Sequence, residues 1–591
     1  MKNNISNNRD TDLSIPKEIP DVRRRDARRF PIGAEVLDAG VSFRLWAPKR
    51  KCVQIIGQSP PDNADHFCFD LRKEEDTGYF SAIIPSMAHG SLYRFRLDNE
   101  ESLYPDPASR YQPHGPEGPS MVVDPDLFTW TDDAWPGISG RGLVLYEMHI
   151  GTFTQEGTWK AAEAQIEELA SIGVTVIEHM PVAEFAGSFG WGYDGVNMFA
   201  PYHVYGSPDD FRAFIDTAHR FGMGVVLDVV YNHFGPDGNY LPAFSENYFT
   251  DRYECEWGRA INFDGPDSAP VREFYLTNAR YWISEFHLDG LRLDATQAIF
   301  DASETYIVKE IVDAARGAAA GRRIYMVAEN EPQDTRFVKS PEGGGYGMDA
   351  LWNDDFHHSA LVAMTGRREA YYTDYLGSAQ EFISLVKYGF LYQGQYYVWQ
   401  EKCRGTASLN ISPSSFILFI QNHDQIANSC CGDRIREVTD DGIFRAMTAL
   451  TLLAPGTPML FQGQEFAASS PFLYFVDLPE DLNEMVRKGR IEFLKQFPSL
   501  IDAESRAIMP DTGKAAFLRS KLDLSERISN SEMYAFHKDL IALRKADPVF
   551  GRQEIGRVDG AVLSPQAFVL RFFGGEEDDR LLIVNIGPDI H

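Results

Sequence analysis

Hydrophobic positions in the first part of the chain follow the two-residue period of β-strands. Val41–Trp46 alternates between apolar and polar side chains, as a half-buried strand does. Shorter runs of the same kind lie near 52–57, 79–84 and 92–97. Helical periodicity is absent before about residue 159. The pattern predicts a mobile leader over residues 1–27, followed by an N-terminal immunoglobulin-like β-sandwich over residues 28–130.

Beyond residue 143 the pattern changes to short apolar runs separated by amphipathic stretches. Leu143–Met148 and Val174–Ile177 are predicted strands, and the segment near 159–172 between them has the period of a helix. A strand, a helix and a strand in this order indicate parallel pairing. Six further runs have the composition of buried strands: Gly224–Asp228, Gly290–Leu293, Ile324–Ala328, Ala350–Trp352, Phe416–Gln421 and Thr457–Phe461. Eight such units predict a (β/α)8 TIM barrel over 131–548, since no glycine-rich dinucleotide motif follows any strand.

Three features refine this picture. Ser207–Asp210 is a strong helix start, with a capping hydroxyl, a proline in the first turn and acids that face the helix dipole. Residues 234–268, rich in Gly, Asp, Asn and aromatic side chains, predict an enlarged loop after the third strand, of the kind that shapes binding sites. After a helix near 530–546, residues 549–591 are predicted to form a small C-terminal β domain. The final apolar run, Leu582–Ile586, suggests that this domain is incomplete.

Composition and charge narrow the possible partners. The chain is 44% hydrophobic and 24% charged, as expected of a folded protein with large cores. Its net charge of −30 disfavours nucleic acid and anionic membranes, because both attract basic surfaces. A neutral substrate meets no such conflict. No apolar run reaches about 18 residues, and the first thirty residues lack a signal-peptide stretch, so a cytoplasmic location is predicted.

Cysteines and one arginine-rich segment have simple interpretations. The six cysteines lack the spacing of a zinc site or a disulfide scaffold, which favours free thiols. Five arginines lie in Val22–Phe30, but Asp21 and Asp26 accompany them. This mixture favours a solvated linker over a polyanion site.

The segment Leu288–Asp294 combines apolar strand positions with a cation and a carboxylate near its end, Arg292 and Asp294. Strand alternation sends Arg292 and Asp294 to one side and Leu291 and Leu293 to the other. The leucines would pack on helices, so the guanidinium and the carboxylate would project together into the mouth of the barrel. There the guanidinium would keep Asp294 ionised and nucleophilic. For this motif alone, a structural ion pair is an equally good explanation.

Polar side chains also follow three other predicted strands: Asp228 with His233, Glu329, and His423 with Asp424. Taken singly, each could be a helix cap, a loop acid or a structural histidine. Four such strand ends meet at one end of a barrel, however, and a glycosidase needs one attacking carboxylate and one protonated carboxyl there. Crowding by Asp294 and Asp424 would raise the pKa of Glu329 toward neutrality, which suits the second role.

In order and spacing, these four segments resemble the conserved regions of the α-amylase superfamily, glycoside hydrolase family 13. The resemblance implies a retaining mechanism with Asp294 as nucleophile and Glu329 as general acid/base, their carboxyl groups about 5–5.5 Å apart. It implies that Asp424 is the third catalytic carboxylate and that Arg292 orients Asp294. The residues that it implies for holding the glucose at the cleaved bond are Asp228, His233, His423 and the stacking aromatic Tyr193.

Within that superfamily, the chain is most similar to the maltooligosyltrehalose trehalohydrolase subfamily, from about residue 30 to the end. The phrases that carry this similarity are Tyr146–Phe153, Met180–Phe185, Ile261–Ser268, Trp352–His358, Asn422–Asn428 and Gln464–Phe472. The resemblance implies hydrolysis of the α-1,4 bond adjacent to the terminal trehalose of maltooligosyltrehalose, which releases trehalose and a shortened maltooligosaccharide. It also implies a maltooligosyltrehalose synthase as pathway partner, and no cofactor.

The phrase after the predicted sixth strand contains five candidate substrate contacts on the trehalose side of the cleft: Trp352, Asp354, Asp355, His357 and His358. A metal cluster is the alternative for its acids and histidines, but no further ligands are evident. Asn232 stands where some amylases bind calcium, which the subfamily generally does without. No metal is therefore predicted.

Two other functions compete with this interpretation. A glucan branching or debranching enzyme of the same superfamily has a similar N-terminal domain and similar barrel motifs, but the subfamily phrases argue against it. A catalytically inactive glycan-binding module would have lost the nucleophile or the acid, whereas all three carboxylates are present here.

Overall fold

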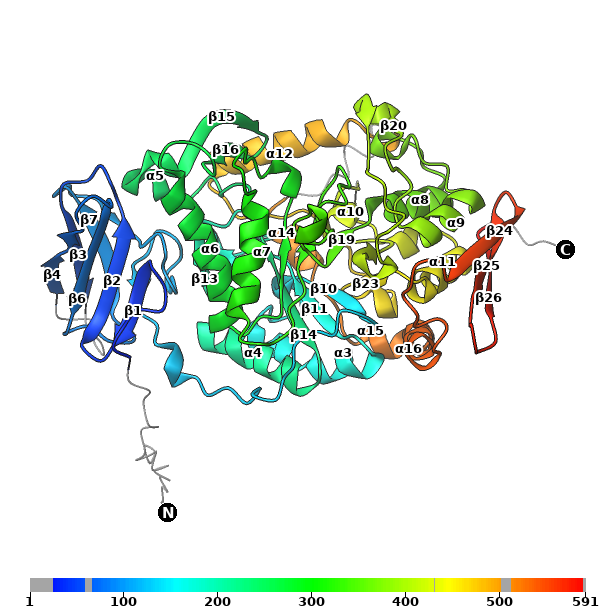
Figure 1. Cartoon of the computed structure of the whole chain (residues 1–591), viewed down its shortest axis with the longest axis horizontal. Helices are drawn as coiled ribbons and strands as arrows, with labels where there is room; N and C mark the ends of the chain where they lie inside the picture. The colour runs from blue at the N-terminus through cyan, green and yellow to red at the C-terminus, as the bar shows by residue number, and fades with distance from the viewer. Residues whose placement is uncertain (1–24, 59–65, 430, 501–511, 588–591) are drawn as a thin grey trace, which may run out of the picture.

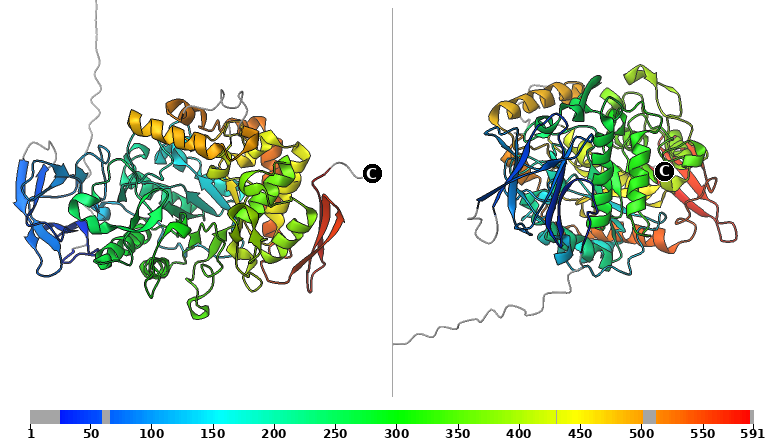
Figure 2. Two further views of the ribbon diagram at one scale, coloured as in Figure 1. Left: turned by 90° about the horizontal axis from the view of Figure 1, so that it is seen from above. Right: turned by 60° about the vertical axis from the view of Figure 1, so that its left-hand side comes forward.

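The computed structural model describes residues 25–58, 66–429, 431–500 and 512–587. All but the last three residues of the predicted leader lie outside this part of the chain. Two N-terminal sheets lie at one end of the molecule, a closed barrel occupies the middle, and a small C-terminal sheet lies at the other end (Figure 1). Figure 2 shows that the two terminal sheets stay far apart when the molecule is turned.

The N-terminal sheets form a sandwich over the predicted β region. One sheet has the order β1 (Gly33–Leu37), β2 (Gly40–Trp46), β6 (Tyr79–Ile84) and β5 (Arg72–Lys73). The other contains β4 (His66–Asp70), β3 (Val53–Gln58), β7 (Leu92–Leu97) and β8 (Leu103–Tyr104), with β9 (Ser120–Met121) on β7. Alternate side chains from both sheets, among them Phe43, Ile55, Phe80 and Phe95, share one core, as the period of two predicts.

The middle of the chain forms the closed, parallel, eight-stranded barrel that the pattern predicts. Its strands follow one another around the barrel in chain order, and each coincides with one of the predicted runs. They are β10 (Leu145–Met148), β11 (Val176–His179), β14 (Gly224–Val229), β17 (Leu291–Leu293), β18 (Val327–Ala328), β19 (Ala350–Trp352), β22 (Phe416–Leu418) and β23 (Thr457–Phe461). The prediction of a TIM barrel is therefore confirmed.

Inward-facing positions of the barrel strands form two layers of different character. The lower layer is apolar and forms its own core, with Leu145, Val176, Val226, Val327, Ala350, Ile417 and Met459. Two residues further along the same strands, the inward layer contains Glu147, Glu178, Asp228, Glu329 and Trp352. Because side chains alternate along a strand, residues i and i+2 face the same way, so these four acids and Trp352 lie directly above the apolar floor. Leu291 and Leu293 face outward into the helical layer, as predicted.

Helices surround the barrel. Ser207 caps α4 (Pro208–Arg220) through a reciprocal capping box with Asp210, as predicted. The single helix predicted near 159–172 is instead two, α2 (Trp159–Glu163) and α3 (Ile166–Ile172). The other long helices of this layer are α6 (Ser268–Glu285), α7 (Ile307–Ala318), α8 (Asp354–Thr365), α9 (Ala379–Tyr388), α11 (Asp441–Leu453) and α16 (Ser531–Ala546).

The enlarged loop after the third barrel strand has its own secondary structure. It contains α5 (Leu241–Phe244) and a hairpin of β15 (Phe249–Cys255) and β16 (Gly258–Ile261), which its irregular pattern did not predict. Near the end of the chain, β24 (Val558–Ser564), β25 (Ala567–Phe572) and β26 (Arg580–Asn585) form an antiparallel sheet. Phe568 of this sheet stacks on Phe382 of α9, which attaches the sheet to the barrel.

The arginine-rich segment is not a solvated linker where the structure describes it. Arg28 donates hydrogen bonds to the carbonyl oxygens of Phe30, Gly33 and Ser42, and burial lowers its pKa to about 10. Arg29 forms an ion pair with Glu285 of α6 at 2.6 Å. Arg28 therefore ties this segment to the N-terminal sandwich, and Arg29 joins it to the barrel. None of the described helices is both long enough and apolar enough to cross a membrane.

Candidate active site

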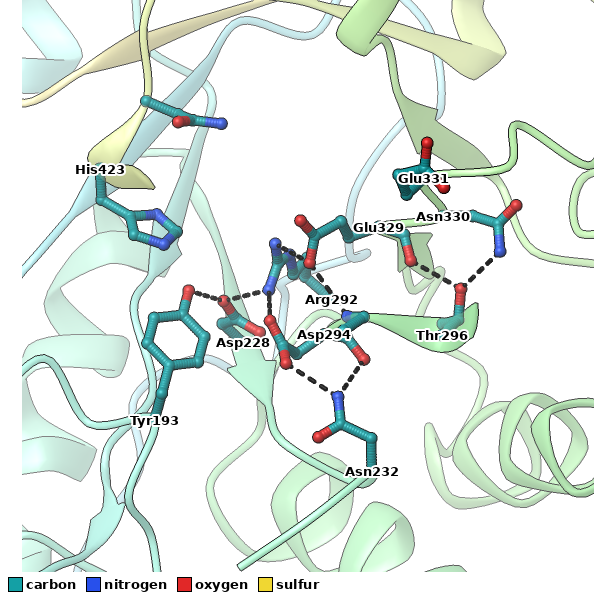
Figure 3. A network of polar contacts seen from close by, with 12 residues as sticks. Tyr193, Asp228, Asn232, Arg292, Asp294, Thr296, Glu329, Asn330, Glu331 and His423 are labelled. Atoms are coloured by element: carbon teal, nitrogen blue, oxygen red, sulfur yellow. Dashed lines mark hydrogen bonds and ion pairs between the residues drawn. The ribbon is translucent and has the colours of Figure 1, made fainter. Parts of the chain in front are cut away.

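Four strand ends bring the predicted polar residues together at one mouth of the barrel (Figure 3). Asp228 belongs to β14 and Arg292 to β17, which also places Asp294 directly after its end. Glu329 follows β18 immediately. The short helix α10 (His423–Ala427), which begins after β22, carries His423 and Asp424. The predicted convergence is thus present in the structure.

Arg292 lies at the centre of the cluster. Its Nη1 donates hydrogen bonds to Asp228 Oδ2 at 2.7 Å and Asp294 Oδ1 at 2.8 Å, and its Nη2 lies 2.9 Å from Glu329 Oε2. The guanidinium lies over the ring of Trp352, 4.1 Å from a ring centroid, and is buried. One fixed, permanently charged group therefore positions three carboxyl groups at once.

Asp294 is held from two sides while one edge stays open. Asn232 Nδ2 donates hydrogen bonds to Asp294 Oδ2 at 2.9 Å and to its carbonyl oxygen at 3.0 Å. The side chain remains 12% exposed, in contrast to the 1% of Arg292. The next residue, Ala295, has a φ of 38°, a strained value for alanine that turns the chain sharply away from the strand. The carboxylate is thus fixed in direction and still open to the cleft.

Of the three carboxyl groups that contact Arg292, that of Glu329 is the most accessible, with 26% of its side chain exposed. The backbone N–H of Ala295 donates a hydrogen bond to Glu329 Oε2 at 3.0 Å. Burial raises the pKa of Glu329, and the charge of Asp294 raises it further, while Arg292 opposes both. The direction agrees with the prediction, but burial is a larger cause than crowding, and of the two acids expected to crowd Glu329 it is Asp294 that raises its pKa. Burial also raises the pKa of Asp424, against the opposing charge of His423.

Asp228 and Tyr193 close one side of the cluster. Tyr193 donates a hydrogen bond to Asp228 Oδ2 at 2.7 Å, and its ring stacks on that of His423 at 5.1 Å. Burial raises the pKa of Asp228 to about 7. Because Arg292 and Tyr193 both donate to Oδ2, the carboxyl group stays fixed in either protonation state.

His233 lies beside Asn232, whose Oδ1 contacts His233 Nδ1. Burial lowers the pKa of His233 to about 4, so its imidazole is neutral near pH 7. Trp257, at the turn of the β15–β16 hairpin, lies against this ring at 5.6 Å and is 46% exposed. Trp257 was missed by sequence reasoning, which recognised the enlarged loop but not the hairpin that brings one aromatic back to the site.

The five candidates after β19 separate into different environments. The indole ring of Trp352 packs beneath Arg292. Asp354, in the first turn of α8, keeps 15% of its side chain exposed beside Arg404, and burial raises its pKa to about 8. Of the candidate acids here, Asp354 is the one that the structure leaves open to the cleft.

Asp355 does not lie in a position from which its side chain could contact a substrate. Its side chain is fully buried, Tyr375 donates a hydrogen bond to Oδ1 at 2.6 Å, and the backbone N–H groups of Leu391 and Tyr392 donate to Oδ2, each at 2.8 Å. Both oxygens are thus already engaged by the protein. The geometry corrects the predicted substrate contact to a structural support of the cleft wall.

The two histidines of this phrase also pack inside the protein. His357 stacks on Phe419 at 5.7 Å, and His358 packs against Tyr375 at 4.9 Å. Burial lowers the pKa of His357 to about 3, and it also lowers the pKa of His358 well below its ordinary value. The side chains of His357 and His358 are buried, at 1% and 5% exposure, so the structure leaves neither open to a substrate. In the described part of the chain, no group of three or more His, Cys, Asp or Glu residues could hold a metal.

Two further charged residues near Glu329 were missed. Arg404 is 2% exposed and forms an ion pair with Glu331, which also accepts a hydrogen bond from Gln400 Nε2 at 2.7 Å. Glu331 lies two residues from Glu329, so it was visible in the sequence as an acid near the site. Arg404 follows the short strand β21 (Lys402–Cys403) in a loop without periodicity, and only the tertiary fold brings it here.

Comparison with known proteins agrees with this architecture. Residues 31–124 match carbohydrate-binding module 48 (isoamylase N-terminal domain), and residues 124–257 match the α-amylase catalytic domain. A malto-oligosyltrehalose trehalohydrolase of Saccharolobus solfataricus is 38% identical over 87% of this chain and 86% of its own length. The chain belongs to the malto-oligosyltrehalose trehalohydrolase family. A family member from Deinococcus radiodurans is 37% identical and covers 95% of this chain and 90% of its own length.

Solved structures of other proteins share the fold of this chain. A putative α-amylase from Salmonella typhimurium has a TM-score of 0.86 at 36% identity, with 95% of each chain covered. A type I pullulanase from Bacillus subtilis has a TM-score of 0.68 at 20% identity, with 94% of this chain and 79% of the other covered. At that identity the pullulanase shares the fold alone.

Proposed function

We propose that the chain is a retaining glycoside hydrolase that cleaves the α-1,4 bond adjacent to the terminal trehalose of maltooligosyltrehalose. One observation carries the chemistry: Asp294 and Glu329 contact different nitrogens of the same guanidinium at the open end of the barrel. The two carboxyl groups are thus held close, as a retaining mechanism needs. Membership of the malto-oligosyltrehalose trehalohydrolase family supports the substrate.

In the proposed mechanism, Asp294 attacks the anomeric carbon while Glu329 protonates the oxygen of the departing trehalose. Water then attacks the glycosyl–enzyme bond, Glu329 takes up its proton, and Asp294 leaves as a carboxylate. The environments support this division of roles, because Asp294 accepts hydrogen bonds from Arg292 and Asn232, while burial raises the pKa of Glu329 and keeps its proton available.

The remaining residues of the mouth would hold the substrate. We propose that Asp424 binds sugar hydroxyls and stabilises the transition state, and that Arg292 orients Asp294. The proposed contacts to the glucose at the cleaved bond are Tyr193, Asp228, His233 and His423. On the trehalose side, Asp354 is the supported candidate, with Trp352 acting through Arg292.

Product analysis tests this function. Purified enzyme is incubated with a maltooligosyltrehalose and, separately, with a plain maltooligosaccharide of the same number of glucose units. We expect rapid release of free trehalose from the first and slow cleavage of the second. Equal rates on the two substrates would overturn the assignment.

A branching activity is the alternative within the superfamily, since a 1,4-α-glucan branching enzyme of Corynebacterium jeikeium is 28% identical over 74% of this chain. The same reactions distinguish it, because a branching enzyme would form new α-1,6 linkages, which NMR detects. We expect none.

Two proposals concern the setting of the reaction. A trehalose unit at the end of a maltooligosaccharide has to be made by another enzyme, so we propose a maltooligosyltrehalose synthase as the pathway partner. We propose the cytoplasm as the compartment, which the sequence predicts. Cell fractionation locates the enzyme, and deletion of the synthase should stop trehalose release while intact enzyme remains in the extract.

A further inference from the structure

His423 is held by a buried acid that the mechanism above does not use. Glu147, on β10, accepts two hydrogen bonds from this one residue: from His423 Nδ1 to Oε1 at 2.5 Å and from the His423 backbone N–H to Oε2 at 3.1 Å. The side chains of Glu147 and His423 are 2% and 5% exposed. Glu147 therefore fixes both the imidazole ring and the first residue of α10, the helix that carries Asp424.

The contact crosses the barrel interior. Around the barrel, β23 separates β10, which carries Glu147, from β22, the strand that precedes His423. Glu147 reaches His423 because alternation points its side chain inward, two positions above Leu145 of the apolar floor. The floor beneath Glu147 is apolar, whereas its own layer also contains Glu178, Asp228 and Glu329, so this acid belongs to the charged layer at the mouth of the barrel.

The charges around this pair favour an imidazolium. Among the described residues, His423 is the only cationic side chain in ion-pair contact with Glu147. A buried carboxylate with a single histidine partner is strongly stabilised when the histidine is protonated. Burial lowers the pKa of His423, but the charge of Glu147 and its hydrogen bond outweigh this and raise it.

Other titratable groups face His423 from several elements. Asp424 of α10 favours its charge, and Arg292 of β17 opposes it. Glu329, which follows β18, and His149, which precedes the short helix α1 (Ile150–Phe153), are also within electrostatic range. The ion pair of His423 is formed with Glu147.

We infer that Glu147 is a positioning residue that holds His423 in the protonated state and in a fixed orientation toward the glucose at the cleaved bond. Glu147 is 2% exposed and both of its carboxylate oxygens accept hydrogen bonds from His423, so it would act through the histidine. This inference rests on the proposed function, in which His423 is a substrate contact. It adds a requirement for a positive charge at His423, which a carboxylate two strands away around the barrel stabilises.

The test is the pH dependence of hydrolysis by Glu147→Gln. Glutamine preserves the shape and one acceptor for Nδ1–H but removes the charge, so His423 should lose its proton at lower pH. We expect kcat/KM to fall about tenfold at pH 7.5 and the difference from wild type to shrink as the pH is lowered, because His423 then needs less help from a neighbouring charge to bind its proton. The alkaline limb of the profile should move to lower pH by about one unit. A loss of equal size at every pH would overturn the inference, because it would show a merely structural role.

A matched control is available in a second buried Glu–His pair. Glu184, which is buried, accepts a hydrogen bond from His203 Nδ1 at 2.8 Å, and this pair is not among the proposed site residues. Glu184→Gln should leave the pH profile of kcat/KM where it is in the wild type. If Glu184→Gln moved the alkaline limb as much as Glu147→Gln, the effect would be general and the inference would fail.

Direct titration separates this inference from the proposed function. In protein with ¹⁵N-labelled histidine, the His423 signal, assigned with His423→Gln, should titrate at lower pH in Glu147→Gln than in wild type. This readout needs no substrate. If the wild-type enzyme released no trehalose, the proposed function would fail while the titration still decided the role of Glu147. An unchanged His423 titration would overturn the inference whatever the activity.

Discussion

At the scale of single residues, Arg292 organises the chemistry. Its guanidinium contacts Asp228, Asp294 and Glu329, yet these three carboxyl groups differ in burial and in their other partners. Glu329 remains the most exposed, whereas Asp228 is nearly enclosed. One guanidinium therefore contacts three carboxyl groups, and differences in their burial and hydrogen bonding decide which of the three keeps its proton.

Removal of either reactive carboxyl tests the assigned roles. We expect Asp294→Ala to abolish turnover and Glu329→Gln to reduce kcat by about a hundredfold or more, because general acid catalysis contributes factors of that order. Circular dichroism should show an unchanged fold for both. Substantial turnover by either variant on maltooligosyltrehalose would contradict the assignment.

The raised pKa of Asp228 has a consequence for stability. Burial raises this pKa to about 7, above the value of about 4 in an unfolded chain. The folded state therefore binds more protons between pH 4 and pH 7, and this carboxyl group lowers stability as the pH rises through that window. We expect Asp228→Asn to lose activity but to gain melting temperature relative to wild type at pH 8, and to gain less at pH 5. A difference that does not change with pH would contradict the explanation.

At the scale of elements, the site depends on close contact between neighbouring barrel strands. Gly290, which precedes β17, packs so tightly that a Cβ atom there would lie 1.9 Å from the carbonyl oxygen of Tyr325, next to β18. A side chain would push apart the strands that carry Arg292 and Glu329. The glycine is therefore part of the geometry that sets the spacing of the carboxyl groups.

Gly290→Ala tests this contact. We expect a loss of about 2 kcal/mol or more in the free energy of unfolding, together with a fall in kcat, since overpacking shifts the backbone on which Arg292 and Asp294 lie. Gly317→Ala in α7 is the control, because a Cβ atom there would meet nothing within 4 Å. That variant should keep its activity and gain up to about 1 kcal/mol. Thermal unfolding and steady-state kinetics measure both effects, and equal behaviour of the two variants would contradict the role of the contact.

At the scale of the whole molecule, a buried network attaches the connection between the N-terminal sandwich and the barrel. Asp132, in that connection, accepts hydrogen bonds from His219 of α4 and from His287, each at 2.8 Å. His219 also contacts Asp289 at 2.7 Å, and Trp135 stacks on the His219 ring at 4.9 Å. The network lies near the beginnings of the strands, away from the catalytic mouth, where a TIM barrel gains stability.

This network should make stability depend on pH. Burial lowers the pKa of His219, but its hydrogen bonds to Asp132 and Asp289 raise it above the ordinary value. A histidine with a raised folded-state pKa contributes stability that is fully present below about pH 6.5 and is lost as the pH rises through the folded value. We therefore expect Asp132→Asn to lower the melting temperature more at pH 6 than at pH 9, with little change in kcat at pH 6. Equal losses at the two pH values would show that charge is not the cause.

The sequence by itself determined the local elements and the identity of the reactive groups. Alternation within Val41–Trp46 and the eight apolar runs predicted the strands correctly, because burial on one or both faces of a sheet imposes a period that one segment reveals alone. The polar residues that end those strands predicted the convergence at one mouth, since the carboxyl ends of parallel barrel strands share one face. Arg292, Asp294 and Glu329 followed from that rule and from a family resemblance.

Only the tertiary structure decided which side chains meet across the barrel. Asp354 and Asp355 are neighbours in the sequence, yet one opens to the cleft and the other is enclosed by Tyr375 and two backbone amides. Glu147 and His423 lie 276 residues apart and form one ion pair. Such contacts depend on strand register, helix rotation and loop path, which are set by packing of the whole chain. The local hydrophobic period of the sequence does not reveal these contacts, so the arrangement of side chains around the substrate follows from the tertiary structure.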